Sequence, residues 1–323
     1  MKVAHFVVIT PGRCGLYETT RELVVALRAQ GVDSRMFDPT QATNKLYPEG
    51  TEDRGALFCD SDWAAGADVF VSHSGLGKWE NDSTQPVIQV AHGRPRHSFL
   101  SEKNGSTPIY SYHYAKNKDP RFKAVVTFWP QHIEYLKFMF PDKPVEYIPA
   151  CVDLERWSPG PTDYDFAGKS GTVNAVITDS WRDDIDPFVP INAFGNWARG
   201  QKDVKLHIFA KNQKDRGWAA LVKRLQDDGT LGVYQGWAKN LEVVYRAADM
   251  VLTGNEIAVR TVREATACGC PVVQFPTADI SNYTQLIETA LASDRAEVRS
   301  SAVSKYNSVA TGEQFKELLD AIH

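Results

Sequence analysis

Two glutamates near the carboxyl end of the sequence have a spacing that suits ligand binding. Glu256 and Glu264 lie eight positions apart in the stretch GNEIAVRTVREATACGCPVV, which begins at Gly254. An apolar strand pattern precedes Glu256, and Glu264 lies about two turns inside the helix pattern that follows. Because a carboxylate accepts two hydrogen bonds side by side, each glutamate could hold a pair of sugar hydroxyls. The spacing alone is equally consistent with a solvated helix that carries incidental acids.

Three basic residues in the same half of the sequence are candidates for contacts with phosphate. Arg182 follows the apolar run 173–178, and Lys211 follows the run 204–210 directly. A cation at the carboxyl end of a parallel strand can neutralise phosphates and stabilise a departing diphosphate. Arg260, one turn after Glu256, is the third candidate.

A glycine-containing loop connects the first strand pattern to the first helix pattern. Gly12 and Gly15 lie in this loop. Glycine lets the backbone approach a ligand closely, and a helix N-terminus offers N–H groups to an anion or a sugar hydroxyl. The pattern is not the Gly-x-Gly-x-x-Gly of dinucleotide sites. A tight turn between strand and helix explains the same glycines without a ligand.

Two histidines directly follow strand patterns in the first half of the sequence. His92 comes after the run 87–91, and His73 comes after the run 68–72. Side chains at the carboxyl ends of parallel strands face the usual ligand-binding edge of the sheet. We therefore predict a catalytic role for His92, with His73 as a competing candidate. A structural hydrogen bond is the alternative for either histidine.

The segment from His92 to Lys123 interleaves basic with aromatic residues. Its candidates for an acceptor-binding surface are Arg94, Arg96, His97 and Tyr112. Basic groups bind phosphates and aromatic rings stack on bases or sugars, so the acceptor could carry phosphates and could be DNA. A solvated loop and helix is the plain alternative.

Composition indicates a globular protein without a globally basic surface. The 323 residues are 43% hydrophobic and carry a net charge of -4, which gives no general reason to expect nucleic acid or an anionic membrane as partner. No run reaches the roughly 20 apolar residues of a membrane span, and the N-terminus lacks a signal-peptide pattern, so we predict a cytoplasmic protein. The five cysteines are scattered, which favours reduced thiols, and Cys268-x-Cys270 is too tight for a structural zinc site.

Short apolar runs alternate with helix patterns along the whole sequence, which predicts parallel sheets. The strand patterns lie at 3–9, 32–37, 68–72, 87–91, 124–128 and 145–148, and then at 173–178, 204–210, 232–235, 250–253 and 272–275. The helix patterns lie at 17–30, 131–140, 187–199, 217–227, 240–248 and 259–268, with two or three more after 280.

The two series of strands predict two domains. Residues 1–156 would form an N-terminal Rossmann-like domain, and residues 173–305 a C-terminal Rossmann-like domain. The stretch 157–172 is rich in Pro, Gly and polar residues and is the predicted linker. The last helix pattern, 306–323, could pack back on the N-terminal domain. Open α/β sheets bind ligands beyond the carboxyl ends of their strands, so a cleft between the domains is the expected site.

The block RAADMVLTGNEIAVRTVREATACGCPVV resembles the signature of family 4 retaining glycosyltransferases of the GT-B fold. Further similar pieces occur in the family's order: the glycine loop, His92-Gly93, the run EYIPACVDLERWSP and YQGW. The resemblance implies an α/β protein of the GT-B fold, with two facing Rossmann-like, doubly wound domains and an interdomain cleft. It also implies that the N-terminal domain, 1–156, lies on the acceptor side and that the C-terminal domain, 173–305, binds the nucleotide sugar.

The resemblance also implies an activity, which is sugar transfer from a nucleotide diphosphate sugar with retention of configuration and without a cofactor or an essential metal. A UDP-sugar is the expected donor because UDP is the commoner carrier. The resemblance implies that Glu264 binds the ribose, Glu256 the hydroxyls of the donor sugar, and Arg182 and Lys211 the diphosphate. It implies that the Gly12–Gly15 loop binds the donor or the acceptor, and that His92 binds the donor sugar near the reacting carbon.

One departure from the family pattern leaves alternatives open. The family usually has small or glycine residues after its first glutamate, where this chain has Ile257, Ala258 and Val259. The donor sugar is therefore open, and a non-catalytic nucleotide-sugar-binding protein and a nucleotide-sugar epimerase are the alternative functions. The sequence also leaves open the oligomeric state and the acceptor, which could be a glycan, a small molecule or DNA.

Overall fold

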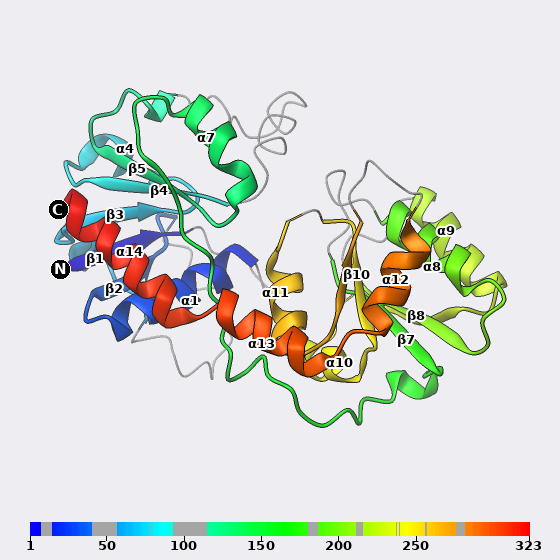
Figure 1. Ribbon diagram of the computed structural model, residues 1–323. Helices are drawn as coiled ribbons and strands as arrows, with labels where there is room; N and C mark the ends of the chain where they lie inside the picture. Colours follow the sequence, from blue (N-terminus) through cyan, green and yellow to red (C-terminus); the bar gives the residue numbers. More distant parts are fainter. Residues whose placement is uncertain are drawn as a thin grey trace. The chain divides into compact units, whose positions relative to one another are not determined.

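The computed structural model describes the chain as two compact units (Figure 1). The described residues are 1–7, 15–40, 57–77, 79–92, 115–179, 187–210, 216–236, 238, 240–255, 257–275 and 282–323. Unit 1 consists of Met1–Cys151 together with Tyr306–His323, and unit 2 is Val152–Lys305. In the described part of the chain, no helix combines the length and the apolar character needed to cross a membrane.

Unit 1 contains a six-stranded parallel sheet with the strand order β2-β1-β3-β4-β5-β6. Its strands are β1 (Lys2–Phe6), β2 (Asp33–Phe37), β3 (Val69–Ser72), β4 (Val87–Ala91), β5 (Phe122–Thr127) and β6 (Val145–Tyr147). The chain runs outward from β1 to β2 and then returns to build the rest of the sheet on the other side of β1. The order therefore reverses between β1 and β3, which is where ligands bind in open parallel sheets.

Aromatic side chains fill one side of this sheet. Phe6, Phe37 and Phe70 are buried, and all three rings contact the ring of Trp79, with centroid distances of 5.5 to 6.0 Å. Burying an aromatic side chain stabilises the fold by about 1.5–3 kcal/mol, so this cluster contributes much of the unit's core energy.

The helices of unit 1 lie at the following positions: α1 (Gly15–Ala29), α3 (Ser61–Ala65), α4 (Trp79–Asp82), a 3-10 turn at Pro130–His132, α7 (Ile133–Met139) and α14 (Ser308–Ile322). Helix α1 buries Leu23, Val24 and Leu27, whose spacing puts them on one face. The short helices α3 and α4 were not predicted, because four or five residues are too few to show a helical period.

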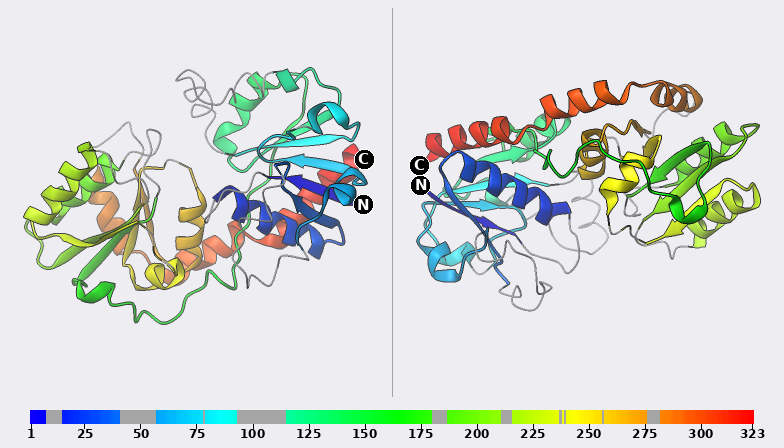
Figure 2. Two further views of the ribbon diagram at one scale, coloured as in Figure 1. Left: turned by 180° about the vertical axis from the view of Figure 1, so that it is seen from behind. Right: turned by 90° about the horizontal axis from the view of Figure 1, so that it is seen from below.

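Helix α14, from the carboxyl end of the chain, lies along α1 (Figures 1 and 2). Gly312 permits the close approach, since a Cβ there would lie 2.7 Å from the carbonyl oxygen of Ala26. Thr311 Oγ1 donates a hydrogen bond of 2.9 Å to the carbonyl oxygen of Pro149, and Phe315 is fully buried. The last helix thus completes the unit that the first residues begin.

Unit 2 contains a five-stranded parallel sheet with the strand order β11-β10-β7-β8-β9. Its strands are β7 (Val173–Ile177), β8 (Val204–Phe209), β9 (Leu231–Gln235), β10 (Met250–Thr253) and β11 (Val272–Gln274). Its helices are a 3-10 turn at Phe166–Gly168, α8 (Phe188–Ala198), α9 (Arg216–Asp227), α10 (Leu241–Ala247), α11 (Arg260–Ala267), α12 (Tyr283–Leu291) and α13 (Arg295–Lys305). Here the strand order reverses between β7 and β10.

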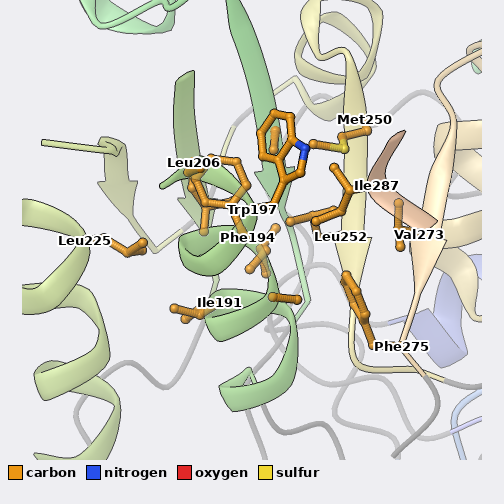
Figure 3. Packing of buried hydrophobic residues seen from close by; sticks show 14 of the residues in the cluster. Ile191, Phe194, Trp197, Leu206, Leu225, Met250, Leu252, Val273, Phe275 and Ile287 are labelled. Carbon is orange, nitrogen blue, oxygen red and sulfur yellow. The ribbon is translucent and has the colours of Figure 1, made fainter. Parts of the chain in front are cut away.

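A buried core of unit 2 lies between this sheet and the helices α8, α9 and α12. Phe194 and Trp197 of α8 and Ile287 of α12 belong to the same buried cluster as Leu206 and Leu252 of the sheet (Figure 3). Apart from α3, α4 and the 3-10 turns, the described elements agree with the sequence patterns, with bounds that differ by at most a few residues.

The segment 157–172, which the sequence indicates as a linker, belongs to unit 2 and packs on it. Trp157 is buried, with its ring centroid 5.9 Å from that of Tyr245. Arg299 Nη1 donates to the carbonyl oxygen of Trp157 at 2.7 Å, and Arg246 Nε donates to that of Ser158 at 2.7 Å. A segment rich in Pro and Gly has no period to read, but its aromatic residues and carbonyls still find partners.

Two helical glycines give a matched test of the packing of α14. We expect Gly312→Ala to destabilise unit 1 by about 1–3 kcal/mol, because the new methyl group meets the backbone of Ala26. Gly195→Ala, in α8, has room, since the nearest atom to its added Cβ is Leu225 Cδ2 at 3.9 Å. This control should leave stability unchanged or raise it by up to about 1 kcal/mol. Urea unfolding of both variants measures the difference, and equal behaviour of the two would contradict the described packing.

Candidate functional site

The structure describes four of the predicted site residues. His92 and Gly15 lie in unit 1, and Arg260 and Glu264 lie in unit 2. The other predicted site residues lie outside the described part of the chain: Gly12, Arg94, Arg96, His97, Tyr112, Arg182, Lys211 and Glu256. Gly15 is the first residue of α1, and a Cβ there would meet no atom within 4 Å, so no described neighbour requires a glycine.

Helix α11 brings Arg260 and Glu264 together on one face. Their spacing of four residues places the side chains one turn apart, and Arg260 Nε lies 2.5 Å from Glu264 Oε1. Only 7% of the Glu264 side chain is exposed. A buried carboxylate is costly without a partner, and the guanidinium provides one. The arginine predicted to bind phosphate therefore forms an ion pair with the glutamate predicted to bind the ribose.

The surroundings of Glu264 place it near the carboxyl end of β7. Tyr245 is fully buried, and burial together with the nearby Glu264 carboxylate raises the pKa of its phenol well above the usual value. The Tyr245 hydroxyl shares a hydrogen bond of 2.9 Å with Thr178 Oγ1, one residue beyond β7. Tyr245 thus stays a neutral phenol that lies near Glu264 and is hydrogen-bonded to the residue directly after β7.

Asp179 joins three elements at this edge of the sheet. It follows β7, its Oδ2 accepts a hydrogen bond from Thr253 Oγ1 at the end of β10, and its Oδ1 accepts one of 3.0 Å from Thr261 Oγ1 in the first turn of α11. The backbone N–H of Asn255 donates to Thr253 Oγ1 at 3.0 Å. One carboxylate therefore fixes the start of the turn between β10 and α11.

The same turn is held from its other side by Gln274 of β11. Its Nε2 donates to the carbonyl oxygens of Asn255, at 2.9 Å, and Ile257, at 3.0 Å. Ile257 is also buried. These two carbonyls belong to the residues on either side of Glu256, so the backbone flanking Glu256 is fixed even though Glu256 itself lies outside the described residues.

Sequence reasoning missed Asp179 and Gln274. In the stretch TDSWRDDIDP it singled out Arg182, although Asp179 stands closer to the end of the strand. The available signal was position, because a polar residue directly after a buried parallel strand lies at the ligand-binding edge.

The cysteines near α11 are thiols. Cys268 and Cys270 are buried, and burial raises the pKa of each to about 12. A group with that pKa is protonated at neutral pH and is a poor metal ligand.

In unit 1, His73 and His92 are brought together rather than being alternatives. His73 Nδ1 lies 2.7 Å from His92 Nε2, and His73 Nε2 lies 3.0 Å from Nδ1 of His5, in β1. His5 is completely buried, which lowers its pKa to about 3, and burial next to the other two rings lowers the pKa of His73 well below its usual value. Both rings are therefore neutral at pH 7. Sequence reasoning missed His5, whose only signal is a histidine inside an apolar strand.

Comparison with solved structures identifies the fold. A glycosyltransferase from Rickettsia africae superposes with a TM-score of 0.72 at 11% identity, over 99% of this chain and 98% of the other. Sucrose-phosphate synthase from Thermosynechococcus elongatus gives 0.70 at 16% identity, over 99% and 98%. HepE from Anabaena, solved in complex with UDP, gives 0.69 at 11% identity, over 99% and 100%.

These similarities, together with the two parallel sheets, define the α/β two-domain fold of GT-B glycosyltransferases. The sequence matches no protein-family model, and comparison with curated protein sequences gives no match. At such low identity the similarity establishes the fold, and the activity has to be argued from the residues.

Thr253 offers a direct test of the network around Asp179. We expect Thr253→Val to speed hydrogen exchange of the Asn255 amide about 5-fold to 100-fold. The valine removes the hydrogen bonds of Thr253 Oγ1 to Asp179 and to the backbone N–H and Nδ2 of Asn255, at a cost of about 1–3 kcal/mol. Thr253→Ser keeps the hydroxyl and should retain protection near that of the unaltered protein. Exchange read by NMR decides the matter, and a valine variant as protected as the serine variant would refute the described network.

Proposed function

We propose that the chain is a retaining glycosyltransferase that moves a sugar from a nucleotide diphosphate sugar, preferably a UDP-sugar, to an acceptor hydroxyl. The observation that carries the proposal is the buried Glu264 carboxylate of α11, held beside the strand-order reversal of a sheet with the GT-B fold. That HepE was solved in complex with UDP supports the choice of nucleotide.

In this proposal Glu264 accepts hydrogen bonds from the two ribose hydroxyls of the nucleotide. A carboxylate has the acceptor capacity for both, and hydrogen bonds to a charged acceptor are among the stronger ones. Arg260 holds the carboxylate in place before the nucleotide arrives. This role differs from the phosphate contact expected from the sequence, and it follows from the 2.5 Å contact between Arg260 and Glu264.

Glu256 is proposed to hold the hydroxyls of the donor sugar. The hydrogen bonds of Thr253 and Gln274 support this role, because they fix the backbone on both sides of it. A fixed backbone keeps a carboxylate in place for the reaction at little further entropic cost. Arg182 and Lys211 are proposed to contact the diphosphate, and His92 the donor sugar.

The reaction forms a bond between the acceptor oxygen and the anomeric carbon while the bond from that carbon to the diphosphate oxygen breaks. The proton of the acceptor hydroxyl passes to the departing diphosphate on the same face of the sugar, which accounts for retention. Cations beside the diphosphate stabilise the charge that develops on it. The proposal requires no metal ion and no cofactor.

A non-catalytic nucleotide-sugar-binding protein is the second candidate. It is favoured by one observation, the buried Ile257 directly after Glu256, where glycosyltransferases of this type usually have small residues or glycine. A bulky residue leaves fewer backbone amides free to hold the sugar.

Binding of UDP and of 2′-deoxy-UDP tests the role of Glu264. We expect loss of the 2′-hydroxyl to weaken binding about 10-fold to 100-fold in the unaltered protein, since a hydrogen bond to a charged group contributes about 1.5–3 kcal/mol. In Glu264→Gln this discrimination should shrink to a few-fold. Glu242→Gln is the matched control. Glu242 is also a mostly buried carboxylate of unit 2, and it forms an ion pair with Arg156. Calorimetry gives each Kd, and unchanged discrimination in Glu264→Gln would exclude the ribose contact.

Turnover separates the two candidate functions. After a thermal-shift screen of UDP-, GDP-, ADP- and dTDP-sugars, mass analysis should detect donor hydrolysis or transfer with the donor that binds. We expect Glu256→Ala to abolish donor hydrolysis and transfer while the melting temperature stays the same. Normal turnover in that variant would exclude the role proposed for Glu256. Binding without any turnover would favour the non-catalytic candidate.

A steep fall of activity with rising salt would indicate a phosphate-bearing acceptor such as DNA.

A further inference from the structure

Three histidine rings form a continuous chain of contacts in unit 1. His5 lies in β1, His73 one residue beyond β3, and His92 one residue beyond β4. The two links are His5 Nδ1 to His73 Nε2, at 3.0 Å, and His73 Nδ1 to His92 Nε2, at 2.7 Å. The sheet register creates the chain, because β1 and β3 pair His5 with Val71, and the N–H of His73 donates to the carbonyl oxygen of Phe6 at 2.9 Å.

Each link requires one hydrogen atom, and a neutral imidazole carries only one. The hydrogens can therefore run in two directions only. They run either outward, from His5 through His73 to His92, or inward, from His92 through His73 to His5.

The buried end of the chain distinguishes the two directions. His5 Nε2 is buried and has no hydrogen-bond partner among the residues that the structure describes, and the His5 ring packs near Phe315, with 6.4 Å between centroids. The inward direction would put the last hydrogen on this Nε2 and bury a donor without an acceptor. Orphaned buried N–H groups are rarer than under-satisfied acceptors, so the outward direction is favoured.

We propose that His5 and His73 are positioning residues that hold His92 with its hydrogen on Nδ1. The Nε2 atom of His92 then accepts from His73, and the ring offers an N–H donor, rather than a basic lone pair, to its ligand. This inference rests on the proposed function in one respect, which is that the ligand of His92 is the donor sugar. His92 then contributes by donating a hydrogen bond to a sugar oxygen and takes no proton from the acceptor.

His207 in unit 2 is a natural reference with the opposite tautomer. Its Nδ1 accepts from the backbone N–H of Val233 at 3.0 Å, so its hydrogen must lie on Nε2, which is 3.1 Å from Asn174 Oδ1. Burial and two nearby lysines lower the pKa of His207 to about 4, so this ring is also neutral at pH 7.

Long-range proton–nitrogen NMR of the protein labelled with 15N-histidine tests the inference without any assay of activity. At pH 7.5 we expect the hydrogen on Nδ1 for His5, His73 and His92, and on Nε2 for His207. A hydrogen on Nε2 of His92, or equal populations of its two tautomers, would overturn the proposal.

Substitutions of His5 test whether the buried end sets the direction. His5→Asn places an amide N–H near the position of Nδ1 and should keep His92 in its tautomer, whereas His5→Leu removes the donor and should let both tautomers of His92 appear.

Where transfer is measurable, we expect the leucine variant to lose about tenfold in kcat, the asparagine variant to retain most of it, and UDP affinity to stay unchanged in both. Protein that binds UDP but shows no transfer would count against the proposed function and leave the tautomer result standing. A leucine variant with an unaltered His92 tautomer would overturn the role of His5.

Discussion

The candidate site of unit 2 depends on the pairing of buried negative charge. Asp179 and Glu264 are both buried, and an unpaired carboxylate at either position would be costly because it would lose its hydration without gaining a partner. Asp179 is satisfied by two threonine hydroxyls and Glu264 by a guanidinium. These partners come from β10 and α11, so satisfying the charges also sets the path of the chain between that strand and that helix.

Both units have a buried hydrogen-bond network at the strand-order reversal, but the two networks use different chemical groups. Unit 2 uses carboxylates and hydroxyls, which are permanent acceptors and rotatable donors. Unit 1 uses neutral imidazoles, in which each ring both donates and accepts, so the arrangement has a direction. A network of hydroxyls can adjust to several ligands, whereas a chain of rings fixes which atom of His92 is the donor.

The sequence predicted most of the fold, because parallel strands buried on both faces appear as continuous apolar runs and the longer helices show a clear period. It predicted that Glu264 lies inside the helix that follows β10, because the helical period is clear there. The role of Glu256 beside it stays a prediction. It could not predict the contact of His73 with His92 or the role of His5, since these depend on strand register between segments about 20 and 70 residues apart. It also read 157–172 as a linker, because irregular backbone that is anchored by Trp157 shows no pattern in one dimension.

Unit 1 is discontinuous in sequence, since α14 packs on α1 from more than 280 residues away. This separation affects the order in which the two units can complete their folding during translation. All of unit 2 emerges from the ribosome before α14 does, so unit 2 can complete its fold while α1 still exposes the surface that α14 will cover. Domains commonly fold as units during translation. Unit 1, which begins first, is therefore completed after unit 2.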